Sequence, residues 1–555
     1  MRFKTDLQFS PLRFFFFFLS LLFVHFKGTS QSISVGQSIL EEAVRRMDIQ
    51  DSSRLSQSVL IRPLHLPNVT NYDSLMQVLT GLETPKRTTF MNGKGSVRFL
   101  PAYFQQQYNS HHAFGWNDGS LFPAKGYQFR ASAGIAANFG ILSIQLKPEL
   151  VFAANPAFRG FSPNQPDSSW YHYYTFQNWI DMPERFGEKS FAKLLPGQSS
   201  IRFNYKGMSL GVSSENLWWG PGTRNALMMS NNAPGFYHIS FNSTRPHKTF
   251  LGKFEWQLIA GTLKNSGVLP PDTSRRLNGQ PLYQPKKTAN RYINAVVIDW
   301  QPKWIKGLNL GFARSFYQYS DNIRPNLNGY LPVLSAFFKG NAQDENEFGR
   351  DQLLSFFFRW VFPKEKAEIY GEWGRNDHSG NLSDFVQEPE HSRAYLLGLK
   401  KIIDLPANRQ LELFGEITQL ETPGTKLVRA LQPWYVHYQV RHGYTHKGQV
   451  LGAGIGPGSN SQTIGVNWYG TQLNKSGLSF DRVVRNNDFY YLAFTGRQLY
   501  DSHWVDLVLS GTKTWHRKRM LYTAHLSLLR SVNYQWNTDD NVNHFQAGFT
   551  LGYLF

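Results

Sequence analysis

Three groups of residues have the types and spacing of known catalytic or metal-binding sites. Residues 207–211 read GMSLG and match the G-x-S-x-G pattern around a hydrolase serine, which works at a strand–turn–helix junction. Glu368 and Glu372 could form a carboxylate pair, and His442 and His446 have the spacing of two metal ligands on a helix. Structural explanations suit all three better, so the sequence predicts no catalytic residue, no metal site and no cofactor.

Alternation of apolar and polar residues surrounds these groups and argues against their chemistry. Ser209 lies in such an alternating run, so we expect a strand there rather than a catalytic turn. Along a strand, Glu368 and Glu372 would lie ~13 Å apart, beyond the ~5–9.5 Å of glycosidase carboxylates. Gly443, between the two histidines, favours a strand or turn. A triad assembled from distant residues keeps an outer-membrane enzyme acting on lipid as a third alternative.

A different chemistry, sugar binding, suits one loop that is rich in glycine and asparagine. Sugar rings stack on aromatic faces, and amides and guanidinium groups bond their hydroxyls and carboxylates. The loop at 213–235 supplies Glu215, Asn216, Trp218, Trp219, Arg224, Asn231 and Asn232. A second aromatic cluster, beside Arg159, contains Trp170, Tyr171, Tyr173, Tyr174 and Trp179, and a weaker third contains Trp434, Tyr444 and His446. The alternative for each cluster is an interfacial aromatic girdle or ordinary turn chemistry.

Composition narrows the class of protein. The chain has 555 residues, no cysteine, 15% aromatic residues and a net charge of +19. The apolar run at 14–26 is shorter than the ~20 residues of a spanning helix and follows basic residues, so residues 1–30 are predicted to be a cleaved signal peptide. A basic exported protein attracts polyanions such as acidic polysaccharide or phosphorylated lipid. Nucleic acid is also a polyanion, but export makes it the least expected partner of the three.

The last eleven residues, Phe545–Phe555, show the clearest strand pattern of the chain. Apolar residues occupy one face, and Gln546, Gly548, Thr550 and Gly552 occupy the other. This length suffices for a strand to cross a bilayer at a tilt, ~9–11 residues. The terminal aromatic residue resembles the signal by which outer-membrane barrels are recognised, so we expect the barrel insertion machinery to be a partner.

Similar alternation continues from about Gly95 onward and predicts an antiparallel transmembrane β-barrel over residues 89–555. The strand candidates include 127–135, 142–146, 201–205, 208–212, 254–258, 293–300, 308–317, 353–362, 367–373, 394–400, 411–418, 434–444, 463–468, 488–494, 504–510 and 522–529. This length of chain suits ~16–18 strands, with long loops facing outward and short turns facing the periplasm.

Residues 31–88 differ from the rest and predict a small periplasmic helical segment. Apolar residues from Ile39 to Met47 share one helical face, and Ser38 with Glu41 fits a capping box. A second helix is predicted over Asp73–Leu82. We expect the segment to pack on one end of the barrel, and a plug inside the lumen is the alternative.

Several motifs in a fixed order carry a family resemblance. They are SENLWWGPGTRNALMMSNNAPG at 214–235, DMPERFG at 181–187, YGEWGR at 370–375 and HGYTHKGQ at 442–449. Together they resemble the capsule assembly Wzi family of outer-membrane proteins of Gram-negative bacteria. The resemblance implies a monomeric barrel of ~18 strands that lies in outer-membrane lipid. It also implies a lectin-like, non-catalytic role in binding capsular or other exported polysaccharide and attaching or organising it at the cell surface. A channel or transport barrel is the second hypothesis.

Overall fold

A computed structural model describes residues 31–51, 58–66, 69–82, 88–334, 349–376, 386–424, 431–497 and 501–555. The predicted signal peptide, residues 1–30, lies outside this described part. Among the described residues, no helix is long and apolar enough to cross a membrane.

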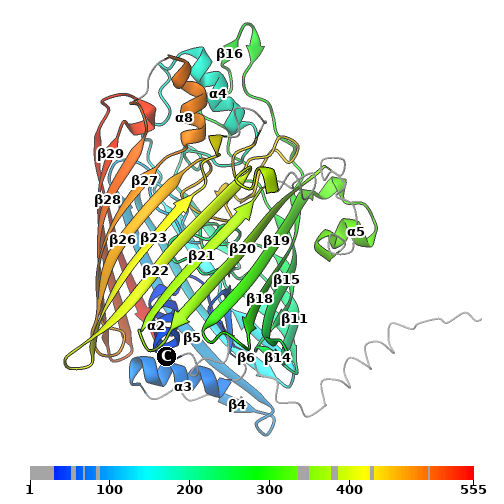
Figure 1. The fold of residues 1–555 in the computed structure, drawn as a ribbon, viewed down its shortest axis with the longest axis vertical. Helices are drawn as coiled ribbons and strands as arrows, with labels where there is room; N and C mark the ends of the chain where they lie inside the picture. Colours follow the sequence, from blue (N-terminus) through cyan, green and yellow to red (C-terminus); the bar gives the residue numbers. More distant parts are fainter. Residues whose placement is uncertain are drawn as a thin grey trace, which may run out of the picture.

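The described strands form a closed antiparallel barrel, which confirms the predicted fold class (Figure 1). Its sheet contains 22 strands, and because some crossings are interrupted these amount to 18 crossings of the wall. They are β4 (Thr88–Phe90), β5 (Gly95–Asn109), β6 (Gly126–Phe139), β7 (Leu142–Leu146), β8 (Glu149–Ala153), β9 (Phe191–Leu195), β10 (Ser200–Tyr205), β11 (Met208–Ser213), β13 (His238–Ser243), β14 (His247–Thr249), β15 (Gly252–Leu263), β18 (Arg291–Pro302), β19 (Leu308–Tyr319), β20 (Arg350–Phe362), β21 (Ala367–Arg375), β22 (Arg393–Leu405), β23 (Arg409–Gln419), β26 (Asn460–Tyr469), β27 (Lys475–Val484), β28 (Val505–Arg517), β29 (Met520–Val532) and β30 (Val542–Tyr553).

Closure occurs at β30, the strand with the clearest pattern. It pairs with β29 on one side and with β5 on the other, where Gln546 lies opposite Asn109. Phe545 and Tyr553 are 42% and 39% exposed, whereas Gln546 is buried in the lumen. The apolar face therefore points to lipid and the polar face points inward, as the alternation predicts. Closure leaves no unpaired edge within the membrane.

Two strand predictions were wrong. Residues 488–494 belong to helix α8 (Asn487–Ala493), because the Asn486 side chain accepts a hydrogen bond from Phe489 N and caps a helix start. Residues 434–444 are an irregular segment in which Trp434, Tyr435 and Tyr444 are all buried. Burial on every side, rather than two distinct faces, explains their apolar character.

The two ends of the barrel differ in their connections. Short turns such as 206–207 and 518–519 lie at the lower end of Figure 1, and long loops lie at the upper end. Short turns of such barrels face the periplasm, so the upper end is the outer end. Above it lie α4 (Asp167–Gln177), α8 and the hairpin β16 (Arg276–Leu277)–β17 (Gln280–Pro281), while α5 (Leu327–Tyr330) lies beside the wall.

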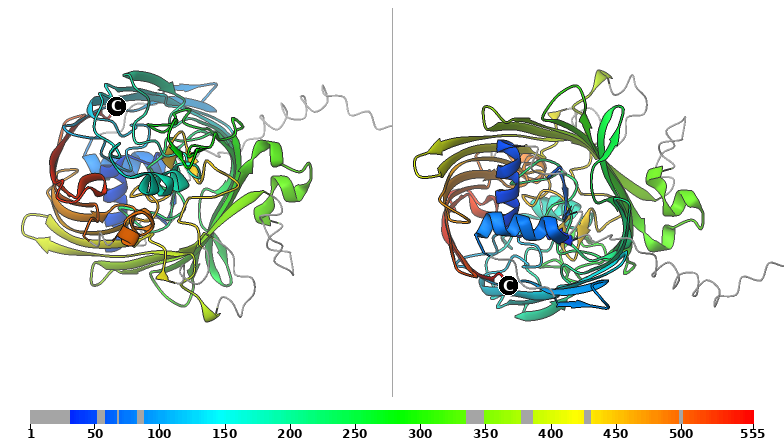
Figure 2. Two further views of the ribbon diagram at one scale, coloured as in Figure 1. Left: turned by 90° about the horizontal axis from the view of Figure 1, so that it is seen from above. Right: turned by 90° about the horizontal axis from the view of Figure 1, so that it is seen from below.

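The N-terminal segment occupies the lower opening and part of the lumen (Figure 2). Strand β1 (Gln31–Ile33) pairs with β3 (Leu64–Leu66). Helix α2 (Ser38–Gln50) lies inside the barrel, surrounded by the wall, and α3 (Val69–Thr80) crosses the lower opening. The N-cap of α2 is Gln37 rather than Ser38, but Glu41 does reach back and accepts a hydrogen bond from Gly36 N at 3.0 Å. Helix α2 therefore lies inside the lumen, where the alternative prediction of a plug would place it.

Candidate functional site

The loop with most of the predicted sugar-binding residues folds down into the lumen instead of extending outward. We call residues 214–235 the inner loop. Its strand β12 (Trp218–Trp219) pairs with β2 (Ile61–Arg62) of the N-terminal segment. This segment lies toward the lower end of the barrel, whereas the loop enters from the outer end. Gly220, with a φ of +99°, supplies the backbone conformation that turns the chain after this pair. The loop therefore connects the outer end to the lower end through the barrel.

Carboxylates of the wall hold the inner loop by its backbone. The backbone N–H groups of Thr223, Arg224 and Asn225 donate to Glu416 at 2.7–3.2 Å, and Leu227 N donates to Glu372 at 3.1 Å. Successive N–H groups converging on one carboxylate satisfy a charge that is buried in the lumen. Glu372 therefore anchors a loop, which is a structural function.

Glu215 is an ion-pairing residue of the lumen. It lies 3.0 Å from Arg202 of β10 and accepts a hydrogen bond from Ser32 at 2.7 Å. Burial alone would raise the pKa of Glu215, but the attraction of Arg202 and His65 and the hydrogen bonds lower it to about 2. Glu215 is therefore charged and fully engaged in the fold.

The other predicted residues of the inner loop divide into two groups. Trp219 is fully buried and donates from Nε1 to Gln257 at 2.8 Å. The Asn216 side chain donates to Asn231, and the Asn232 side chain donates to the Val450 carbonyl. By contrast, the side chains that line a common lumen cavity are those of Trp218, Arg224 and Asn231. The structure thus brings part of the predicted set together, but inside the barrel.

The second predicted cluster forms part of the outer cap. Trp170 is 2% exposed and lies beneath Arg275, whose guanidinium carbon is 4.6 Å from the ring centroid. Trp179 is half-buried against the core. Tyr171 is 51% exposed on α4, so of these three its ring is the one open to a ligand.

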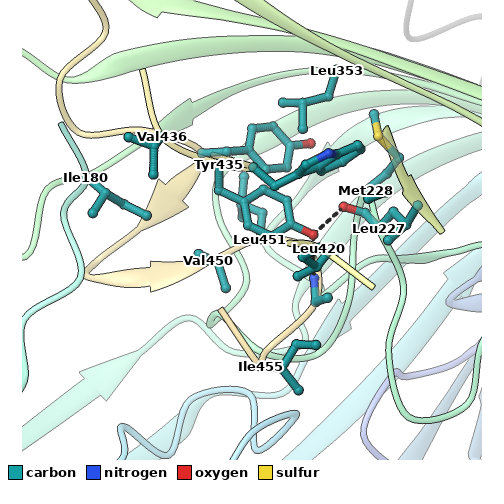
Figure 3. Packing of buried hydrophobic residues seen from close by; sticks show 14 of the residues in the cluster. Ile180, Leu227, Met228, Leu353, Leu420, Tyr435, Val436, Val450, Leu451 and Ile455 are labelled. Atoms are coloured by element: carbon teal, nitrogen blue, oxygen red, sulfur yellow. Dashed lines mark hydrogen bonds between the residues drawn. The ribbon is translucent and has the colours of Figure 1, made fainter. Parts of the chain in front are cut away.

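A hydrophobic core in the lumen includes Trp434 and Tyr444 of the third predicted cluster, and Figure 3 shows the part of this core around Tyr435. His446, the third member, is buried and accepts a hydrogen bond from Lys264 N at 3.0 Å. Tyr435 donates to the Leu227 carbonyl at 2.9 Å and thereby joins the segment at 434–444 to the inner loop. The short hairpin β24 (Thr445–His446)–β25 (Gln449–Val450) continues this segment. Loops, rather than a water-filled pore, therefore occupy this part of the barrel.

Cationic side chains gather at the outer end, and we call them the basic patch. The patch consists of Lys193, Lys264, Lys286, Lys287, Arg441 and Lys447. Buried Arg291 holds its two loops together by donating to the carbonyls of Lys264 and Gly443 at 3.1 and 2.7 Å. Asp181 is the acid that interacts with this cluster, and Ser266 already donates to it twice.

Burial and neighbouring cations lower the pKa of two lysines of the basic patch. Burial, together with Lys193 and Lys264, lowers the pKa of Lys447 to about 8. Burial lowers the pKa of Lys286 to about 8; Asp181 opposes this shift, and Arg441 and Arg291 add to it. A bound anion would relieve the repulsion among these cations. The net charge predicted a basic surface. The sequence did not identify the residues of the basic patch, because they come from separate parts of the chain.

Comparisons with known proteins agree with the barrel. The chain resembles the structure of Wzi of Escherichia coli, an outer-membrane carbohydrate-binding β-barrel involved in group 1 capsule assembly, with a TM-score of 0.58 and 12% identity over 94% of this chain and 100% of that one. OprB of Pseudomonas putida has a TM-score of 0.36 and 12% identity over 83% and 95% of the two chains. OccK2 of Pseudomonas aeruginosa has a TM-score of 0.38 and 9% identity over 84% and 98%.

No curated protein matches the sequence. The family model described as capsule assembly protein Wzi matches residues 105–543, which is most of the barrel. The chain therefore belongs to the capsule assembly protein Wzi family.

Proposed function

We propose that this chain is an outer-membrane barrel that binds an acidic exported polysaccharide at the basic patch and helps to hold it at the cell surface. The observation that carries the proposal is the basic patch, in which cationic side chains from separate parts of the chain lie close enough to influence one another. A repeating anion such as an acidic polysaccharide can contact several of these cations at once. The resemblance to a carbohydrate-binding barrel supports the same class of ligand.

The contents of the lumen favour binding over transport. The buried core and the inner loop lie across the path that a solute would take. Conduction requires a continuous polar path through the barrel. The positions of two candidate catalytic residues support a non-catalytic role. Ser209 lies within strand β11, and Glu368 pairs with Arg45 at 2.7 Å.

The first experiment compares the surface polysaccharide of wild-type cells, deletion cells and cells with Lys264→Gln, Lys286→Gln and Lys447→Gln combined. The proposal predicts that the deletion releases polysaccharide into the medium while total synthesis is unchanged. The triple variant should release it as well, because the patch loses three of its positive charges.

A matched control removes the same charge from the lower end. Lys248, Lys253 and Lys303 are exposed beside short turns, and replacing all three with Gln should leave retention intact. Both triple variants must insert equally, as judged by their heat-dependent migration in gels. An intact coat in the deletion strain would contradict the proposed role, and equal release by the two triple variants would contradict the assigned site.

A further inference from the structure

A cavity of about 450 Å³ lies in the lumen beside the inner loop. It is bounded by α2, by the inner loop, by the loop at 114–118 and by wall strands from β22 through β30 to β6. The volume falls within the ~300–1,000 Å³ of small-molecule sites. It is separate from the basic patch, because none of the patch residues lines it.

Uncharged hydrogen-bonding side chains cover the strand side of this cavity. Ser510 and Ser527 hydroxyls lie 2.8 Å apart, and His525 accepts or donates at 2.8 Å from Ser527 and 3.1 Å from Thr512. Thr512 and His525 are only half-buried. Hydroxyls both donate and accept, so this wall can match a ligand that also carries many hydroxyls.

Each of the six cations that line the cavity has an acid as its ion-pair partner, either in the lining or in the wall behind it. Arg45 lies 2.7 Å from Glu368, Lys400 lies 3.7 Å from Glu412 and Arg130 lies 4.0 Å from Glu149. Arg62 lies 3.2 Å from Glu41, and Lys475 lies 2.6 Å from Glu42. Arg224 likewise lies 2.9 Å from Asp481 of the wall. A charged ligand would have to compete with these pairs, whereas an uncharged ligand would not.

Asp118 is a further acid at the cavity. Burial raises the pKa of Asp118 to about 6, although Arg130 and Arg224 act to lower it. Phe114 and Phe414 add apolar ring surface to the lining. Hydroxyl groups, charges that already have partners and a few aromatic rings together form a lining that can contact both the polar and the apolar faces of a sugar ring.

We infer that the lumen cavity is a binding site for an uncharged saccharide of one or two rings. The site is distinct from the basic patch and would hold a short neutral portion of a glycan or a free sugar. It explains why the inner loop leaves space at this wall while it fills the rest of the lumen. Ordered water is the other occupant that such a wall could hold, and the experiment separates the two.

Two glycines provide a blocking variant and a matched control. Gly548 lines the cavity, and a Cβ built there meets its nearest neighbours at 3.5 and 3.7 Å, which is ordinary contact. Gly548→Trp should therefore fill the cavity without backbone strain. Gly511 pairs with outward-facing Leu526, and a Cβ there meets nothing within 4 Å. Gly511→Trp should place the same side chain in lipid.

The test measures binding of maltose, cellobiose and lactose to the full chain in a detergent without sugar groups, by saturation-transfer NMR and calorimetry. We expect saturable binding of at least one disaccharide to the wild type and to Gly511→Trp. Gly548→Trp should weaken it by at least about tenfold. Thr512→Trp, which enters the cavity from β28, serves as a second blocking variant if Gly548→Trp does not fold.

Two results would overturn the inference. Absence of saturable binding for all three disaccharides would leave water as the occupant, and undiminished binding in a folded blocking variant would place the sugar elsewhere. The triple lysine variant of the basic patch should bind the disaccharide normally. Loss of polysaccharide retention and loss of disaccharide binding are therefore separable, so either proposal can fail alone.

Discussion

The buried pair of Glu215 and Arg202 provides a quantitative test of the structural role of the inner loop. Both residues are nearly inaccessible, at 0% and 3% exposed. Burial opposes the charge of Glu215, yet Arg202 and the neighbouring hydrogen bonds lower its pKa from 4.5 to about 2. Each pKa unit corresponds to about 1.36 kcal/mol, so the charged carboxylate contributes about 3 kcal/mol at neutral pH.

The pH dependence follows from the direction of this shift. Because the pKa of Glu215 is lower in the folded chain, its contribution is complete above about pH 4.5 and is lost as the pH falls through about 2. Glu215→Gln should therefore lower the free energy of unfolding by about 3 kcal/mol at pH 7 but by only about 1 kcal/mol at pH 3. Guanidinium denaturation in micelles, followed by tryptophan fluorescence, gives both values.

A matched exposed carboxylate separates this effect from the loss of any acid. Glu188 is exposed at the outer end, and Glu188→Gln should change the free energy of unfolding by less than about 0.5 kcal/mol at either pH. Equal stability of Glu215→Gln and the wild type at pH 7 would refute the reasoning. A loss that is the same at pH 3 as at pH 7 would show instead that packing, and not charge, is responsible.

Three further predictions concern the lumen and the basic patch. Trp219→Ala should cost about 3–5 kcal/mol of stability, measured by the same denaturation, because the fully buried ring and its bond to Gln257 are lost. Polyanion binding should weaken as the pH rises through about 8, since Lys286 and Lys447 lose their charge there, and calorimetry with the purified surface polysaccharide measures this. In planar bilayers the chain should show no stable conductance, and open-channel currents would favour the transport hypothesis.

The barrel itself could be predicted from local patterns because membrane strands have two chemically different faces. Residues 545–553 alternate, and the structure gives them the predicted lipid and lumen faces. Where a segment is surrounded by protein, alternation no longer distinguishes a strand from an irregular segment, as the buried Trp434 and Tyr444 show. Strand β27, with Lys475 and Asp481 on its lumen side, was missed because those charges interrupt an apolar run.

The candidate sites were harder to predict because they depend on contacts between distant parts of the chain. The aromatic and asparagine content of the inner loop suggested an exposed binding surface, but Asn216 and Trp219 use their polar atoms within the fold. Nothing local to Lys264 or Lys447 shows that they lie together. Their segments bond each other directly, since Lys447 N donates to the Lys264 carbonyl at 2.8 Å, and Arg291 bonds both segments from a third position in the sequence.

The direction of the inner loop has a physical cause in the wall carboxylates. A barrel of 18 strands is too wide for its own side chains to fill, so inward-facing acids need partners from elsewhere. Glu416 receives three backbone N–H groups from the inner loop, and Glu372 receives another. A loop that extended into the medium would leave these carboxylates unsatisfied, at a cost of about 1–3 kcal/mol or more for each. The Gly-Pro-Gly turn before Thr223 therefore serves to present N–H groups to the wall carboxylates, and the outer surface is left to other loops for binding.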